Sequence, residues 1–118
     1  MDHNNNLLPE VIEVKTTDGV IVLKPSQILY IKAERKFSVI FFEDKSNMIV
    51  FHMLNWFEGR LRPPCFCRSH NSYLINCCHV HSIDHSSIIL NGKIPVPVSR
   101  KKMDHFRENL KDFHRIER

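Results

Sequence analysis

Eight side chains that could bind a metal or carry out thiol chemistry fall within 21 residues of the chain. They are Cys65, Cys67, His70, Cys77, Cys78, His79, His81 and His85. Structural zinc sites usually separate paired ligands by about two to four residues. One residue separates the first two cysteines and none separates the last two, so the spacing disfavours zinc. No flanking signature supports a Cys–His nucleophile pair. A metal- or redox-sensing interaction module built on this cluster is kept as the alternative function, beside plain core thiols and surface imidazoles.

The glycine content argues against nucleotide chemistry. Only Gly19, Gly59 and Gly92 are present, so neither a glycine-rich phosphate loop nor a dinucleotide fingerprint fits. Nucleotide-dependent catalysis by the common motifs is therefore not expected. Because the spacing also disfavours a zinc site and no signature supports a nucleophile pair, we expect a protein that is not an enzyme and that needs no cofactor.

Three separate stretches carry donors suited to DNA. They are residues 35–38 (RKFS), 68–72 (RSHNS) and 99–102 (SRKK). Arginine pairs with two acceptors of guanine and asparagine with the edge of adenine, whereas lysine, serine and backbone amides suit phosphates. We expect SYLIN (72–76) to form a tight apolar turn, in which residues 73–75 anchor the middle stretch and hold His70 and Asn71 outward.

Each of these residues also has a structural explanation. Asn71 and Asn76 fit turn caps, His70 fits a half-buried imidazole, Arg68 fits an ion pair with a carboxylate, and Arg100 fits a contact with the C-terminal helix. Tyr30 and Trp56 are more typical of a core than of a stacking surface for bases.

The positive charge of the chain is confined to one segment. Residues 1–59 carry six basic and eight acidic side chains, residues 60–102 carry seven and one, and residues 103–118 carry four of each. A localised basic excess indicates a polyanionic partner, although solvated surface arginines are the simpler explanation.

Length and composition fit one ordered domain. The chain has 118 residues, of which 42% are hydrophobic, enough for a core without disulfides or a metal. No run approaches the ~20 apolar residues that span a bilayer, and the start, MDHNNNLLPE, lacks the features of a signal peptide. We expect a cytoplasmic protein with reduced cysteines.

Turn signals and periodicity predict mostly short strands. We expect a hairpin around Asp18-Gly19, an edge strand containing Pro95 and Pro97, and a C-terminal helix with Ser99 as its N-cap. The other expected strands span residues 28–34, 37–42, 48–51, 65–68, 80–84 and 87–91, with a short helix over 53–61. An apolar stripe at Met103, Phe106, Leu110 and Phe113 marks the C-terminal helix as a packing element.

Three motifs in order resemble the LytTR-type DNA-binding domain of bacterial transcription regulators. They are TTDGVIVLKPSQILYIKAERKFSVI (16–40), FCRSHNSYLINCCHVHSID (66–84) and IILNGKIPVPVSRKK (88–102). The resemblance covers residues 10–103. We accordingly divide the chain into a flexible tail (1–9), the LytTR-like domain (10–103) and a helical extension (104–118), and the absence of room for a receiver domain predicts a stand-alone regulator or an excised domain.

The resemblance implies a mainly β fold, an elongated assembly of small antiparallel sheets with a short helix after the fifth strand and a C-terminal helix. It implies loops inserted into successive major grooves of double-stranded DNA, and a homodimer on repeated half-sites about one helical turn apart. The implied base-reading residues are Lys36, Phe37, Ser38, Asn71 and Arg100. Those implied to contact the backbone or to support the loops are Arg68, His70, Ser99 and Lys101. Asn71 departs from the basic residue common in its slot and favours adenine.

Overall fold

The computed structural model describes residues 8–117, with side chains to residue 115, so most of the expected tail lies outside it. The strands are β1 (Ile12–Thr16), β2 (Gly19–Leu23), β3 (Ile28–Ala33), β4 (Ser38–Phe42), β5 (Asn47–Val50), β6 (Phe66–His70), β7 (Tyr73–Asn76), β8 (Val80–Ile83), β9 (Ser87–Leu90) and β10 (Ile94–Pro97). The helices are α1 (Leu54–Arg60) and α2 (Met103–Glu117), and short 3₁₀ turns occupy Pro25–Gln27, Cys77–His79 and Arg100–Lys102.

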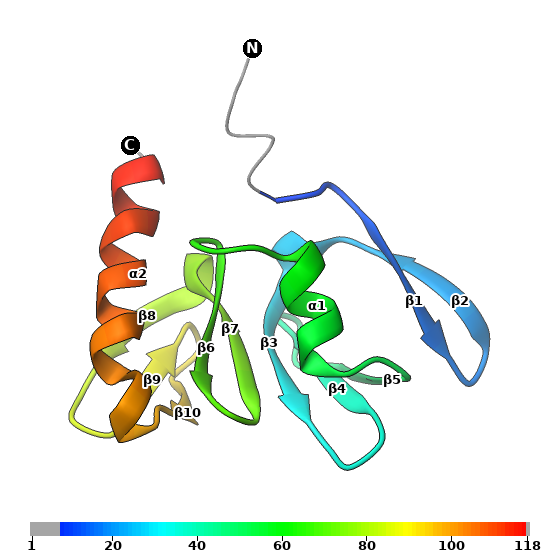
Figure 1. Cartoon of the computed structure of the whole chain (residues 1–118). Helices are drawn as coiled ribbons and strands as arrows, with labels where there is room; N and C mark the ends of the chain where they lie inside the picture. The colour runs from blue at the N-terminus through cyan, green and yellow to red at the C-terminus, as the bar shows by residue number, and fades with distance from the viewer. Residues whose placement is uncertain (1–7, 118) are drawn as a thin grey trace.

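The strands form three antiparallel sheets (Figure 1). The central sheet has the order β5-β4-β3-β7-β6, the hairpin β1-β2 stands at one side, and the sheet β10-β9-β8 lies at the other. The expected mainly β class, with a short helix after the fifth strand and a C-terminal helix, is confirmed. The principal extents of 38, 38 and 25 Å show that the assembly is extended in two directions rather than in one. Across residues 8–117, no helix is long and apolar enough to cross a bilayer.

Local signals produce the hairpin and the edge strand as expected. In β1, Ile12 and Val14 are buried while Glu13 and Lys15 are exposed, which is the alternation of a strand with one wet face. The turn after β1 ends at Gly19, whose φ of +98° favours glycine. β10 lies at the edge of its sheet, where the missing donors of its two prolines cost no ladder hydrogen bond.

The expectation of a tight apolar turn over residues 72–76 is wrong. Residues 73–76 form β7, which pairs with β3 on one side and β6 on the other. Leu74 and Ile75 are both fully buried although they face opposite sides of the sheet. A strand covered on both faces has a continuous apolar run without alternation, and such a run does not reveal its period. The preceding strand is also longer than expected, because β6 reaches His70.

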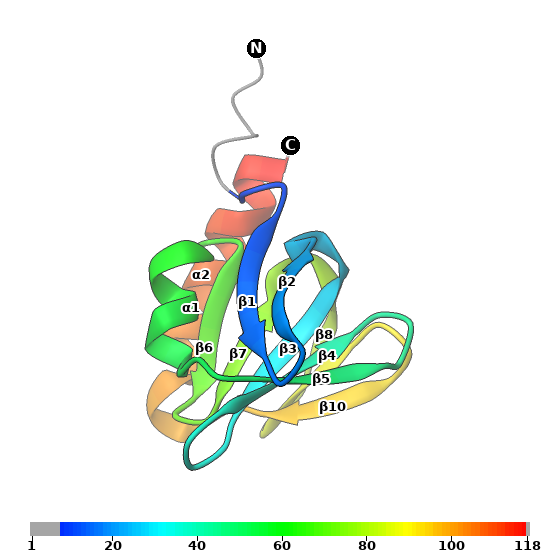
Figure 2. The same ribbon diagram turned by 90° about the vertical axis from the view of Figure 1, so that its right-hand side faces the viewer.

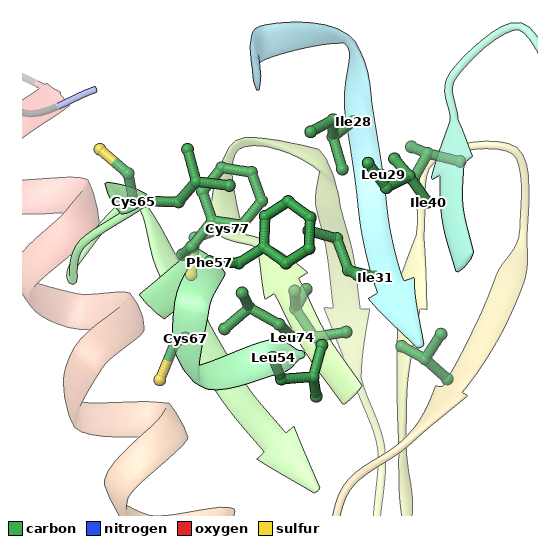
Figure 3. Packing of buried hydrophobic residues seen from close by; sticks show 14 of the residues in the cluster. Ile28, Leu29, Ile31, Ile40, Leu54, Phe57, Cys65, Cys67, Leu74 and Cys77 are labelled. Carbon is green, nitrogen blue, oxygen red and sulfur yellow. The ribbon is translucent and has the colours of Figure 1, made fainter. Parts of the chain in front are cut away.

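Helix α1 covers one face of the central sheet. Its buried side chains Leu54 and Phe57 lie beside Ile31 and Leu74 (Figure 3). Figure 3 also shows Cys67 on the side of this core that faces α2. The core is therefore continuous from α1 through the sheet toward α2.

Helix α2 packs against the domain, as its apolar stripe predicts. Phe106 and Phe113 are buried, and Asn109 donates from Nδ2 to the carbonyl oxygen of Pro64 at 3.0 Å and to Sγ of Cys77 at 3.4 Å. The expected side-chain cap from Ser99 is wrong. Its backbone is extended as a cap requires, but its side chain makes no capping hydrogen bond and the Arg100–Lys102 turn intervenes before α2.

Candidate nucleic-acid interface

The middle stretch of donors forms the loop between β6 and β7. Asn71 is exposed at its tip. His70 is half-buried, and its Nδ1 accepts the backbone N–H of Ser72 at 3.1 Å. Because Nδ1 is the acceptor, the neutral ring carries its proton on Nε2 and is a donor there. The loop therefore offers an exposed amide beside an imidazole whose tautomer is fixed.

Arg68 supports this loop from inside. Its Nη2 lies 3.1 Å from Oε1 of Glu58 on α1, and its Nη1 donates to the carbonyl oxygen of Asn71 at 2.7 Å. The side chain is only 24% exposed. The ion pair expected as the structural explanation for Arg68 is thus present. The guanidinium connects the tip of the loop to α1, which is a supporting arrangement rather than an outward-facing one.

The first stretch forms the loop between β3 and β4. Lys36 is exposed and Phe37 is half-buried. Ser38 is fully buried and its Oγ donates to the carbonyl oxygen of His52 at 2.7 Å. Its hydroxyl is therefore directed into the protein, a placement that does not suit a base contact. Arg35, Lys36 and the exposed part of Phe37 present side chains outward from this stretch.

The third stretch lies between β10 and α2. Arg100 and Lys101 are exposed in the 3₁₀ turn, and Ser99 is half-buried. The backbone N–H of Ser99 donates to the carbonyl oxygen of Ser69 at 2.7 Å. Ser69 is itself fully buried, and its Oγ donates to the carbonyl oxygen of Pro97 at 2.9 Å.

Hydrogen bonds between elements bring the three loops to one edge of the molecule. The backbone N–H of Ala33 donates to the carbonyl oxygen of Ser72 at 2.8 Å, which joins the first loop to the middle one. The hydrogen bonds of Ser69 with the N–H of Ser99 and the carbonyl oxygen of Pro97 join the middle loop to the third. Figure 1 shows the β3–β4 loop, the β6–β7 loop and the start of α2 along the same lower edge. Lys36, Asn71 and Arg100 therefore come from a single row of loops, with Asn71 in the middle.

Sequence reasoning missed the residues that hold this row together. Ser69 and Glu58 were not singled out, because a serine in a polar stretch and a glutamate on a short helix carry no distinctive signal.

A second missed group joins α1 to β1. The ring of His52 stacks on Trp56 with centroids 3.5 Å apart, Arg60 lies 3.9 Å above the Trp56 ring, and Nε2 of His52 accepts the backbone N–H of Lys15 at 3.0 Å. Burial, with the charges of Lys15 and Arg60, lowers the pKa of His52.

The geometry does not support the alternative metal or redox function. In the part of the chain with described side chains, no three His, Cys, Asp or Glu groups lie together as metal ligands would. Cys65, Cys67 and Cys77 are buried and Cys78 is exposed. Burial raises the pKa of Cys67 to about 12 and raises that of Cys77 as well. Thiols held protonated in this way are poor nucleophiles and poor metal ligands at neutral pH.

The sequence and the fold are both similar to known proteins. The sequence model of the LytTr DNA-binding domain matches residues 18–111. The LytTr DNA-binding domain of a Bacillus cereus protein, described as a methyl-accepting/DNA response regulator, has the same fold with a TM-score of 0.72. It shares 30% identity over 86% of this chain and 96% of that domain.

Two curated bacterial proteins are similar at 27% identity. The sensory transduction protein LytT of Enterococcus faecalis matches over 106 residues, which are 86% of this chain and 43% of that protein. The transcriptional regulatory protein YpdB of Escherichia coli matches over 105 residues, which are 84% of this chain and 42% of that protein. The chain spans less than half the length of these two relatives.

Proposed function

The chain belongs to the LytTR family of DNA-binding domains, and from this premise we propose that it reads a specific duplex sequence with three loops. We infer that it acts as the DNA-binding part of a transcription regulator of the response-regulator type in the bacterial cytoplasm, without catalysis. The names of its two curated relatives, a sensory transduction protein and a transcriptional regulatory protein, support this setting. The observation that carries the proposal is the row of loops that Ala33–Ser72 and Ser69–Ser99 hydrogen bonds hold together.

The chemistry of each exposed side chain suggests its role. Arg100 suits the O6 and N7 acceptors of guanine, and Asn71 suits the N6 and N7 edge of adenine. Lys36 and Lys101 suit phosphates. Phe37 offers an apolar surface to a thymine methyl group.

The remaining candidates take supporting roles. Arg68, His70 and Ser99 hold the loops through their hydrogen bonds. Ser38 contributes through the backbone of the loop that it anchors, since its side chain is buried. We further propose that two copies occupy half-sites about one helical turn, roughly 10 bp, apart.

Selection from random duplexes followed by sequencing tests the proposal and supplies the recognised site. On that site, Arg100→Ala should lose discrimination at one base position by about 1–3 kcal/mol, because a two-acceptor contact to one base is lost. Lys101→Ala is the matched control and should weaken all sequences alike. Failure to enrich any sequence, or a uniform loss of affinity in Arg100→Ala, would contradict base reading by this loop.

A further inference from the structure

The exposed large apolar side chains of the described chain come from two neighbouring segments. Val20 and Val22 belong to the hairpin and Val11 directly precedes it, whereas Ile49, Phe51 and Met53 belong to β5 and the loop that follows it. Each of the six side chains is between 45% and 59% exposed. Apolar patches that stay contiguous on a small domain mark contact surfaces more often than scattered single residues do. The loops proposed to read DNA contribute none of these six residues.

The hairpin presents one side of its two strands as an outer face. The register pairs Glu13 with Val22 and Lys15 with Val20, and cross-strand partners point to the same side of a sheet. The segment after β5 lies beside β1, where the backbone N–H of Phe51 donates to the carbonyl oxygen of Lys15 at 2.9 Å, and the side chain of Phe51 is 49% exposed. Figure 2 shows the hairpin in front of the rest of the molecule, with no element covering it.

Two opposite charges lie at the centre of this surface. Glu13 and Lys15 are two residues apart on β1 and both exposed, so their side chains point to the same side of the hairpin as Val20 and Val22. A two-fold axis between them would place each glutamate opposite the lysine of a second copy. A surface that carries its own complementary charge in this way is suited to an isologous contact, in which the same patch is used by both partners.

We propose that this outer hairpin face, made of Val11, Glu13, Lys15, Val20, Val22 and Phe51, is the contact surface for a second copy of the chain. Burial of the apolar side chains provides the affinity between the two copies. The two Glu13–Lys15 ion pairs across the axis set the orientation of one copy relative to the other, because exposed ion pairs add little affinity but select orientation. The hydrogen bond from the backbone N–H of Lys15 to Nε2 of His52 holds the hairpin in place and leaves the Lys15 side chain available for this contact. The proposal concerns self-association in solution and does not depend on DNA binding.

Sedimentation equilibrium of the whole chain, from micromolar to several hundred micromolar and without DNA, tests this contact. We expect a reversible monomer–dimer equilibrium in the unmodified protein. Val22→Asp should raise the dimer dissociation constant by about tenfold or more, since it buries a charge at the centre of the contact. Glu13→Lys should raise it about fivefold or more, because two lysine–lysine contacts replace two ion pairs.

The charge-exchanged variant decides the geometry. In Glu13→Lys with Lys15→Glu, each pair is reversed but still complementary across a two-fold axis, so dimerisation should return to within about threefold of the unmodified protein. Glu108→Lys, the same change of charge on exposed α2, is the matched control and should leave dimerisation unchanged. Circular dichroism of each variant shows that the fold is retained.

Three results would overturn the proposal. One is an unmodified chain that stays monomeric throughout this concentration range. Another is a dimer that Val22→Asp leaves intact. The third is a charge-exchanged variant that dimerises no better than Glu13→Lys.

Discussion

Arg68 makes two contacts that hold it inside the protein, and these contacts decide what its loss should do. It connects Glu58 on α1 with the carbonyl oxygen of Asn71, so its positive charge is already paired. We expect Arg68→Ala to weaken binding to the selected duplex by about 1 kcal/mol or more, since the loop loses its brace. The slope of log K against log salt should stay the same, because no phosphate contact is lost.

Lys101 provides the comparison, since it is exposed and suits a phosphate. Lys101→Ala should make the salt slope shallower by about 0.9, the change for one phosphate contact on duplex DNA. Fluorescence anisotropy of a labelled duplex over a series of salt concentrations measures both variants. An equal flattening of the slope in Arg68→Ala would mean that its guanidinium reaches the DNA backbone.

The cysteines make a separate prediction about reactivity. The pKa of Cys67 is raised to about 12, mainly by burial, and that of Cys77 is raised for the same reason. At pH 8 both stay protonated and shielded, and Cys65 is buried as well, so the folded protein should show one rapidly reacting thiol, the exposed Cys78, which Cys78→Ser removes. A disulfide-exchange reagent monitored by absorbance counts the thiols before and after unfolding. Rapid reaction of three or four thiols in the folded protein would restore the redox alternative.

Side-chain roles were predictable from the sequence only where they are local. Asn76 was expected to cap a turn, and its Oδ1 does accept the backbone N–H of Cys78 at 3.0 Å. The same side chain also donates to the carbonyl oxygen of Ile28, 48 residues away, at 2.9 Å. Ser69 acts entirely through such distant partners, so nothing in its neighbourhood could identify it.

Helix α2 illustrates how one buried amide can join an element to the domain. Asn109→Ala removes the Nδ2 group that donates to both Pro64 and Cys77, and it leaves the Pro64 carbonyl oxygen without this partner. We expect the free energy of unfolding to fall by about 1–3 kcal/mol. Urea denaturation measures the loss, and Glu108→Ala, an exposed neighbour on α2, should stay within about 0.5 kcal/mol of the unmodified protein. A negligible effect of Asn109→Ala would mean that α2 is not held by this contact and behaves as a separable extension.

Elements with strong local signals were predicted well, and those defined by their neighbours were not. The turn at Asp18-Gly19 and the prolines of β10 identify their strands without tertiary information. β7 is short, lacks alternation and follows a polar loop, so its identity as a strand depends on pairing with β3 and β6. The same limit applies to Ser38, whose burial results from contact with the segment after β5.

The arrangement of the three sheets determines which loops can act together. Residues 36, 71 and 100 are far apart in sequence, and composition alone does not place them on one edge. The resemblance of the motifs supplied that expectation, and the hydrogen bonds of Ala33 and Ser69 give it a physical basis. The outer hairpin face lies at a different side of the molecule from the row of loops (Figure 1). The loops would therefore stay accessible to DNA when two copies associate through their hairpins.

A two-fold contact through the hairpins makes a prediction about DNA. The two rows of loops would be related by the same axis, so the half-sites that they suit are inverted rather than direct repeats. We expect duplexes with two inverted copies of the selected half-site to bind about tenfold more tightly than duplexes with direct copies, once the spacing has been varied over one helical turn. Gel-shift titration with both sets of duplexes measures this ratio.

Glu13→Lys should reduce the ratio toward one while leaving affinity for a single half-site unchanged, because it weakens the contact between copies and touches no residue of the loops. Tighter binding to direct repeats would instead require a head-to-tail contact, which the self-complementary charges of the hairpin face do not favour.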